Sequence, residues 1–258
     1  MSTAETTESV SAIVALDTIE EFLSYLSPLV DEAKLAFTED GLRVAAVDPA
    51  NVAMVAVELD AAAFEDYEAT DTTIAVNVSR FADVLAAGRD SLVQLWFDAT
   101  RRVLEVQIGA TEYELACIDP GSVRQEPDIP DLDLDSTVIL EADELSHGAT
   151  VADIAQSGDS TRVVLGTQTG PAAFVMNATG DTDTMDITLE ADDVIDLQVG
   201  GDVSSMFSLD YVTSILKPID DDTEVTVDVG DGYPTRFELQ FSEGFGNVTY
   251  NLAPRVQT

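Results

Sequence analysis

The sequence predicts an α+β fold in which one plan, two helices with several antiparallel strands, is built twice along the chain. Apolar residues recur at helical spacing in four short segments, and alternating, strand-like runs fill much of the remainder. The order of these elements in the first half is repeated in the second. So few helices cannot cover both faces of the sheets, which favours antiparallel sheets over a parallel α/β arrangement.

In the first half, a helix is predicted over 17 to 26 by the spacing of Ile19, Phe22, Leu23 and Leu26. A strand-like run follows from Leu35 to Val57, interrupted by a turn at Glu39-Asp40-Gly41. A second short helix is expected over 78 to 87. Alternation then predicts strands at Leu92 to Asp98, Arg102 to Ile108 and Glu112 to Ile118.

The second half repeats this order, beginning with a predicted helix over 142 to 156. Its second helix, 208 to 217, carries Leu209, Val212 and Leu216, each 131 positions after Val78, Phe81 and Leu85. The predicted strands are Arg162 to Gly166, Ala172 to Ala178, Asp186 to Glu190, Val194 to Val199, Glu224 to Val229, Arg236 to Phe241 and Asn247 to Leu252. The repetition predicts two similar domains.

A connector over 118 to 135 separates the two halves, because it holds three prolines, one glycine and no helical period. We therefore expect an acidic tail over 1 to 8, a first domain over 9 to 117 and a second over 136 to 258. Ile129, Leu132 and Leu134 are apolar residues in an otherwise acidic tether. Part of the connector is therefore expected to lie against a surface.

The charge of the chain is strongly one-sided. It has 50 Asp and Glu against 11 Lys and Arg, a formal net charge of -39, while 45% of its residues are hydrophobic. Disorder requires low hydrophobicity alongside high charge, so this composition predicts a folded protein. Repulsion of this size is nearly erased at about 1 M salt, where the Debye length is about 3 Å. We therefore predict an intracellular protein of a cell with a molar-salt cytoplasm.

The sequence also predicts a cytoplasmic location. Cys117 is the single cysteine, so no internal disulfide can form, which favours a reducing compartment. The first ten residues lack the basic start and apolar core of a signal peptide. No stretch approaches the ~18 apolar residues that a membrane span needs, so no membrane partner is expected.

Catalytic chemistry finds little support in the sequence. His147 is the single histidine, which excludes a histidine-rich zinc site, and no nucleophile elbow or phosphate-binding loop occurs. The acidic clusters at 220 to 222 and at Asp131, Asp133 and Asp135 lack the EF-hand spacing. We therefore predict no catalytic residue, no metal and no cofactor, and keep a metal-dependent hydrolase built on acidic clusters as an alternative.

Three segments form a specific combination. The strand, turn and strand from Asp40 to Val55 read DGLRVAAVDPANVAMV, the end from Asn247 to Val256 contains Leu-Ala-Pro-Arg, and Ile129-Pro130 lies between the halves. Together they resemble the sliding clamp family of the proliferating cell nuclear antigen type, in a halophilic archaeal form. The resemblance extends over residues 10 to 256, in the order of the segments and in the length of the chain between them.

The resemblance implies a DNA clamp fold assembled into a closed trimeric ring without enzymatic activity. Such a ring encircles double-stranded DNA regardless of sequence, after an ATP-dependent clamp loader has placed it there. It tethers DNA polymerases, a flap endonuclease and DNA ligase through short peptide motifs, which raises their effective concentration. A homotrimer of the replicative form is preferred, and a subunit of a heterotrimeric checkpoint-type clamp remains the alternative.

The resemblance also implies two sets of contact residues. A short partner peptide is expected to insert aromatic and aliphatic anchors into an apolar pocket. The pocket residues would be Val47, Asn51, Val52, Met54, Ile129, Pro234, Ala253 and Pro254. The subunit interface is expected to join edge strands, Thr111 to Cys117 of one protomer and Ala172 to Ala178 of the next. Its apolar and aromatic residues would be Tyr113, Leu115, Cys117, Phe174 and Met176.

The predicted helices depart from the family, whose members line the hole with basic residues. The four segments hold two bases, Arg80 and Lys217, against eight acids, a net charge of 2 − 8 = −6. These acids are Asp17, Glu20, Glu21, Asp83, Asp143, Glu144, Asp153 and Asp210. Either contact with the duplex is lost, or it is carried by a few basic residues together with bridging cations, which we favour. The candidates for these DNA-facing contacts are Arg80, His147 and Lys217.

Dilution from molar salt to ~0.1 M is predicted to loosen the trimer or its domains. The reason is that the Debye length grows from about 3 Å to about 10 Å, so the carboxylates repel one another over the whole surface. Sedimentation and thermal unfolding at both salt concentrations measure the effect. Equal stability at both would contradict the prediction.

Overall fold

The computed structural model describes residues 9–125, 134–156 and 161–255. The chain divides into two compact units, which are described separately. The first consists of Met1–Pro49, Val55–Pro127 and Gln240–Val248, and the second of Ala50–Met54, Asp128–Leu239 and Thr249–Thr258. Each unit thus includes short segments from the other half of the sequence.

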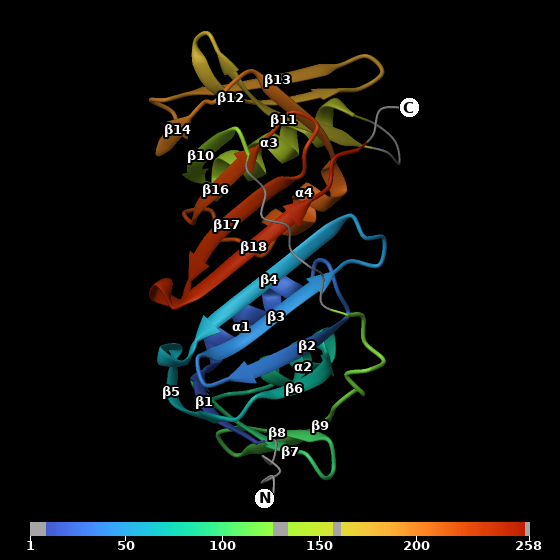
Figure 1. Cartoon of the computed structure of the whole chain (residues 1–258), viewed down its shortest axis with the longest axis vertical. Coiled ribbons are helices and arrows are strands. Elements are labelled where there is room, and N and C mark those ends of the chain that lie inside the picture. Colours follow the sequence, from blue (N-terminus) through green and yellow to red (C-terminus); the bar gives the residue numbers. More distant parts are fainter. Residues whose placement is uncertain (1–8, 126–133, 157–160, 256–258) are drawn as a thin grey trace, which may run out of the picture. The chain divides into compact units, whose positions relative to one another are not determined.

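In the first half of the chain, the described residues form nine strands and two α-helices, labelled in Figure 1, and one short 3₁₀ helix. In chain order the strands and α-helices are β1 Val10–Ala15, α1 Leu16–Leu26, β2 Glu32–Thr38, β3 Gly41–Val47, β4 Ala53–Asp60, β5 Phe64–Ala69, β6 Thr72–Asn77, α2 Val78–Ala86, β7 Leu92–Asp98, β8 Val103–Ile108 and β9 Thr111–Ala116. The strands lie in the orders β5-β1-β7-β8-β9 and β4-β3-β2-β6. The pairs β1–β5, β1–β7, β2–β3, β2–β6, β7–β8 and β8–β9 are antiparallel, as predicted.

The second half repeats this plan. Its elements are β10 Ser136–Glu141, α3 Ala142–Ala155, β11 Arg162–Thr169, β12 Ala172–Thr179, β13 Thr184–Glu190, β14 Asp196–Gln198, β15 Val203–Ser208, α4 Leu209–Leu216, β16 Glu224–Val229, β17 Thr235–Phe241 and β18 Gly246–Leu252. The strands lie in the orders β14-β10-β16-β17-β18 and β13-β12-β11-β15. Adding nine to each strand number of the first half gives these orders, so the predicted duplication of the fold is confirmed.

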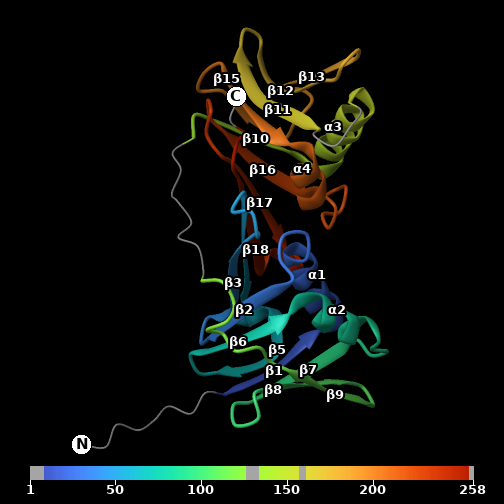
Figure 2. The ribbon, with the colours of Figure 1, turned by 90° about the vertical axis from the view of Figure 1, so that its right-hand side faces the viewer.

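Each pair of helices packs together on one side of its sheets, as Figure 2 shows for α1 with α2 and for α3 with α4. The predicted apolar stripes face inward. Phe22 and Leu26 of α1, Phe81 and Leu85 of α2, and Val212 of α4 are fully buried. Burial of these side chains is the dominant stabilising contribution, because apolar surface removed from water lowers the free energy of the folded state.

Four strands that the sequence analysis did not predict, β1, β6, β10 and β15, run directly into helices. The junction residues Ala15, Asn77, Glu141 and Ser208 have extended backbones and occupy the N-cap positions of the helices that follow, where Asn77 accepts a capping hydrogen bond with its side chain. No glycine or proline marks the change, so the usual signal of an element boundary is missing. β5 was also missed, because it is an outermost strand whose sequence, FEDYEA, is mostly polar.

Gly166 of β11 is predicted to be required for the pairing of β11 with β15. It lies opposite Ser204, and a Cβ at this position would overlap the carbonyl oxygen of Val203. Gly166→Ala should therefore cost about 1–3 kcal/mol of unfolding free energy, measured by denaturant unfolding in molar KCl. Gly201→Ala is the matched control, because its Cβ would meet one atom, at 4.0 Å. Equal stability of the two variants would contradict the prediction.

Candidate functional site

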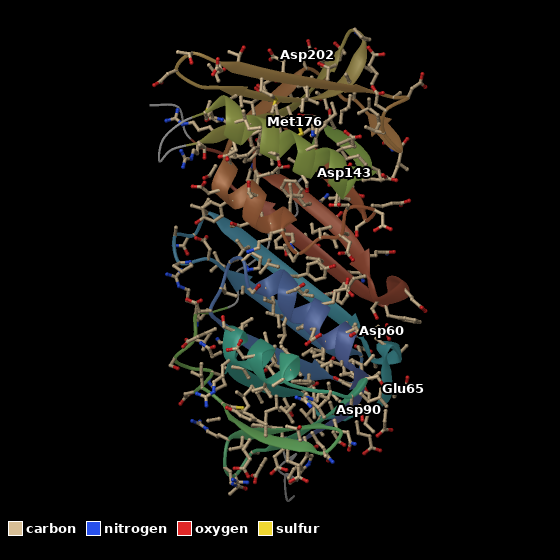
Figure 3. The ribbon with its side chains drawn as sticks, turned by 180° about the vertical axis from the view of Figure 1, so that it is seen from behind. Asp60, Glu65, Asp90, Asp143, Met176 and Asp202 are labelled. Carbon is tan, nitrogen blue, oxygen red and sulfur yellow. The ribbon has the colours of Figure 1, made fainter. Side chains whose placement is uncertain are left out.

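The helix face of the second unit is acidic. A groove of about 560 Å³ lies between α3 and α4, and Lys217, which caps the end of α4, shares its lining with Asp153, Asp210 and Asp221. His147 is exposed on α3, and Asp143 lies at one end of the same helix (Figure 3). The basic candidates of this unit are therefore exposed, but they lie among carboxylates that would repel a phosphate backbone.

Arg80 of α2 is held by an edge strand. Its guanidinium donates hydrogen bonds to the Tyr113 hydroxyl, from Nη2 at 2.9 Å and from Nε at 3.3 Å. Its backbone N–H is accepted by Asn77 Oδ1 at 2.8 Å, which fixes the first turn of the helix. The structure thus joins a residue predicted to face DNA to a residue predicted at the subunit interface.

The edge-strand prediction is correct in one half and wrong in the other. β9 is the outermost strand of its sheet among the described residues, and it carries the half-exposed Tyr113 and the buried Leu115. β12 is an interior strand, paired with β11 on one side and with β13 on the other. Ala172 to Ala178 therefore cannot be an edge.

Phe174 and Met176, two predicted interface residues on β12, are core residues of the second unit. Both are fully buried, and Met176 lies beside α3 (Figure 3), where its Sδ would be 2.5 Å from a Cβ at Gly148. The outermost strand of that sheet is β13. Its half-exposed Ile187, which lies between the buried Met185 and Leu189 in the alternation of the strand, was missed because local periodicity does not reveal pairing order.

The beginning of the connector is attached to the first unit by Arg124. Its guanidinium donates to the carbonyl oxygens of Asp48 at 3.2 Å and of Pro49 at 2.9 Å. A groove of about 450 Å³ lies there, lined by Val47, Arg124 and neighbouring residues of β2 and β3. Arg124 was missed by the sequence analysis, because contacts with backbone carbonyls leave no motif.

Asp119, at the start of the connector, accepts a hydrogen bond from the Gly121 N–H and another from the Arg102 guanidinium. Both contacts lower the pKa of its carboxyl group. These contacts hold the chain directly after β9, where Cys117 N–H also donates to Arg102 O at 2.9 Å. The first residues of the connector are therefore fixed, with ionised Asp119 as the favoured form.

Most of the predicted peptide pocket lies in the second unit. Val52, Met54, Pro234, Ala253 and Pro254 are all half-buried, which leaves part of each surface open to a partner, and Asn51 is exposed. Ala253 N–H donates to Val52 O at 2.9 Å, and Arg255 N–H donates to Met206 O at 2.7 Å, so the carboxyl-terminal segment is fixed.

Two members of the predicted pocket remain to be placed. Val47 belongs to the first unit, so its membership stays a prediction. Ile129 lies outside the described residues.

The described residues also bear on other classes of function. Among them, no three His, Cys, Asp or Glu side chains lie close enough together to hold a metal ion. No described helix is long and apolar enough to cross a membrane.

Comparisons with known proteins agree on one family. The family model described as "Proliferating cell nuclear antigen, N-terminal domain" matches residues 15–119. The DNA polymerase sliding clamp of Haloarcula marismortui is 45% identical over 249 residues, which are 96% of this chain and 99% of that protein. The clamp of Halobacterium salinarum is also 45% identical, over 96% of this chain and 98% of that protein.

A solved structure is similar in fold and sequence. It is the structure titled "C-terminal region of FEN-1 bound to A. fulgidus PCNA", which is 32% identical to this chain. The TM-score is 0.87, and the match covers 96% of this chain and 99% of that one.

Cys117 is predicted to react slowly with alkylating reagents in the folded protein. Burial raises the pKa of its thiol, so less of the reactive thiolate is present at neutral pH than for a free cysteine. Alkylation followed by mass spectrometry should therefore accelerate at a more alkaline pH than for the unfolded chain. A folded protein whose rate rises at the same pH as the unfolded chain would contradict this.

Proposed function

Because this chain belongs to the proliferating cell nuclear antigen family of DNA sliding clamps, we propose that it forms a homotrimeric ring around duplex DNA that holds the replicative polymerase at the primer end. The observation that carries this proposal is the match with DNA polymerase sliding clamps over nearly the whole length of both proteins. Tethering raises the local concentration of the polymerase and so its processivity. The chain acts as a platform, and no catalytic activity of its own is proposed.

The ring is proposed to close through β9 of one protomer and β13 of the next. In the duplicated plan, β18 corresponds to β9, and β4 corresponds to β13. Asp60 N–H donates to Phe245 O and Ala253 N–H to Val52 O, both at 2.9 Å, which ties the flanks of β4 to those of β18. The equivalent strands β9 and β13 are outermost within one chain, so a second copy supplies the missing neighbour.

Other partners are proposed to bind through the peptide pocket. The A. fulgidus relative was solved with the carboxyl-terminal region of the flap endonuclease FEN-1. We extend this mode of binding to DNA polymerases, the clamp loader and DNA ligase, whose short motifs would fill the half-buried residues around Ala253 and Pro254. We propose that this work takes place in the cytoplasm, because the relatives are archaeal clamps.

Contact with DNA is proposed to depend on threading more than on ionic attraction. The exposed Lys217 shares its groove with three carboxylates, and Arg80 is hydrogen-bonded to Tyr113. At molar salt the attraction from counter-ion release has largely disappeared for any protein. Cations bridging carboxylates and phosphates, with Arg80, His147 and Lys217, would supply the remaining contacts.

Charged substitutions at the two edges test this assembly. Tyr113→Asp and Ile187→Asp each place a carboxylate at the proposed junction and should shift the sedimentation of the chain in molar KCl from trimer to monomer. They should also shorten the products of the cognate polymerase with its loader. Ile195→Asp is the control, because Ile195 is 50% exposed and lies in neither β9 nor β13.

A trimer unaffected by either edge variant would contradict the proposed interface. A wild-type chain that sediments as a monomer at every molar-salt concentration would contradict the homotrimer and favour assembly with other subunits.

A further inference from the structure

Asn251 of β18 has an unusual environment for an amide. Along this strand Val248, Tyr250 and Leu252 are fully buried on one face, while Asn247 is exposed and Thr249 half-buried on the other. Because side chains alternate along a strand, Asn251 belongs to the second face, and yet it is only 5% exposed. The strand therefore buries a polar side chain at its carboxyl-terminal end, on the face opposite the core.

The amide group of Asn251 has no hydrogen-bond partner among the described residues. Both Oδ1 and Nδ2 are shielded from solvent, and neither is within hydrogen-bonding geometry of another group. Buried amides are almost always hydrogen-bonded, since an unpaired donor or acceptor carries the full free-energy cost of its removal from water. An orphaned amide in an otherwise satisfied strand points to a ligand that completes it.

The position of Asn251 links it to the peptide pocket. Ala253 follows two residues later, directly after the end of β18, and its N–H donates to Val52 O at 2.9 Å. Both Ala253 and Val52 are half-buried pocket residues of the same unit. The buried amide therefore lies directly before the carboxyl-terminal segment whose surface the proposed function assigns to partner peptides.

The chemistry of the amide selects one kind of partner group. A carboxamide presents a donor and an acceptor side by side, and a phenolic hydroxyl can accept from Nδ2 while donating to Oδ1. A phenyl ring can do neither and would leave the amide unpaired. Because both amide atoms are shielded in the free chain, an entering anchor must widen the pocket to reach them. The new hydrogen bonds offset part of the free energy that this widening costs.

We propose that Asn251 is a specificity residue that makes the pocket prefer partner peptides anchored by tyrosine over those anchored by phenylalanine. This inference rests on the proposed function, because it assumes that the surface around Ala253 and Pro254 binds peptides. Asn251 would select among partners in a way that the apolar pocket residues cannot, since apolar side chains contact the rings of tyrosine and phenylalanine equally well.

The test compares two versions of one probe. The probe is the carboxyl-terminal FEN-1 peptide seen on the A. fulgidus relative, made with phenylalanine in all aromatic anchor positions or with tyrosine in all of them. Affinities are measured by calorimetry in molar KCl for the wild-type trimer, for Asn251→Leu and for Thr249→Val. Leucine keeps the branched outline of Asn251, with as many non-hydrogen side-chain atoms and none of them polar, and Thr249→Val changes the same face of the same strand.

The wild type and Thr249→Val should bind the tyrosine version about tenfold more tightly, the equivalent of one pair of well-made hydrogen bonds. Asn251→Leu should bind both versions with equal affinity, or prefer phenylalanine, and should unfold at a temperature at least as high as the wild type. Sedimentation confirms that each variant is still a trimer.

A tyrosine preference of the same size in the wild type and in Asn251→Leu would overturn the inference while leaving the clamp function intact. A wild type that binds the phenylalanine version as tightly as the tyrosine version would also overturn it. Failure of both versions to bind a wild-type trimer would overturn the peptide pocket itself, and this inference with it.

Discussion

An unpaired strand at the edge of a sheet is the constraint on which the rest of this structure depends. The duplicated plan places β18 and β4 at equivalent positions to β9 and β13, and the flanks of the first two are joined by backbone hydrogen bonds within the chain. β9 and β13 have no neighbouring strand on their outer side among the described residues of one chain. An exposed edge with half-buried apolar residues such as Ile187 invites pairing with another copy, and repetition of one heterologous contact generates a ring.

The acidic surface is compatible with this design because a ring does not need strong attraction to its DNA. A protein that remains bound by ionic contacts loses affinity steeply with salt, whereas a threaded ring is retained until it opens or the DNA ends. The scarcity of free basic groups on the helices then carries little penalty. Arg80 is an example, since its guanidinium donates to the Tyr113 hydroxyl on β9, the edge strand of the proposed junction.

The sequence was sufficient to predict the four helices, the duplication and the family. Helical periodicity is a local signal, and the stripes around Phe22 and Phe81 are strong enough to locate their helices to within a residue or two. The strands that lead into helices escaped detection because Ala15, Asn77, Glu141 and Ser208 change the backbone direction without a turn residue.

The order of strands within a sheet is a nonlocal property, and sequence alternation does not contain it. Phe174 and Met176 were therefore placed at an edge that belongs to β13, although they lie in the core. The roles of Arg124 and Asn251 escaped prediction for a related reason. One depends on backbone carbonyls distant in sequence, and the other on the absence of a partner, which only a folded structure can reveal.

The most direct test of the account is retention on DNA before and after linearisation. The ring is loaded on nicked circular DNA with its loader and ATP, washed in molar KCl, and the DNA is then cut once. The account predicts that the protein stays with the circle through the wash and is released on cutting, because a threaded ring slides off a free end. Loss during the wash, or equal retention on circular and cut DNA, would contradict encirclement.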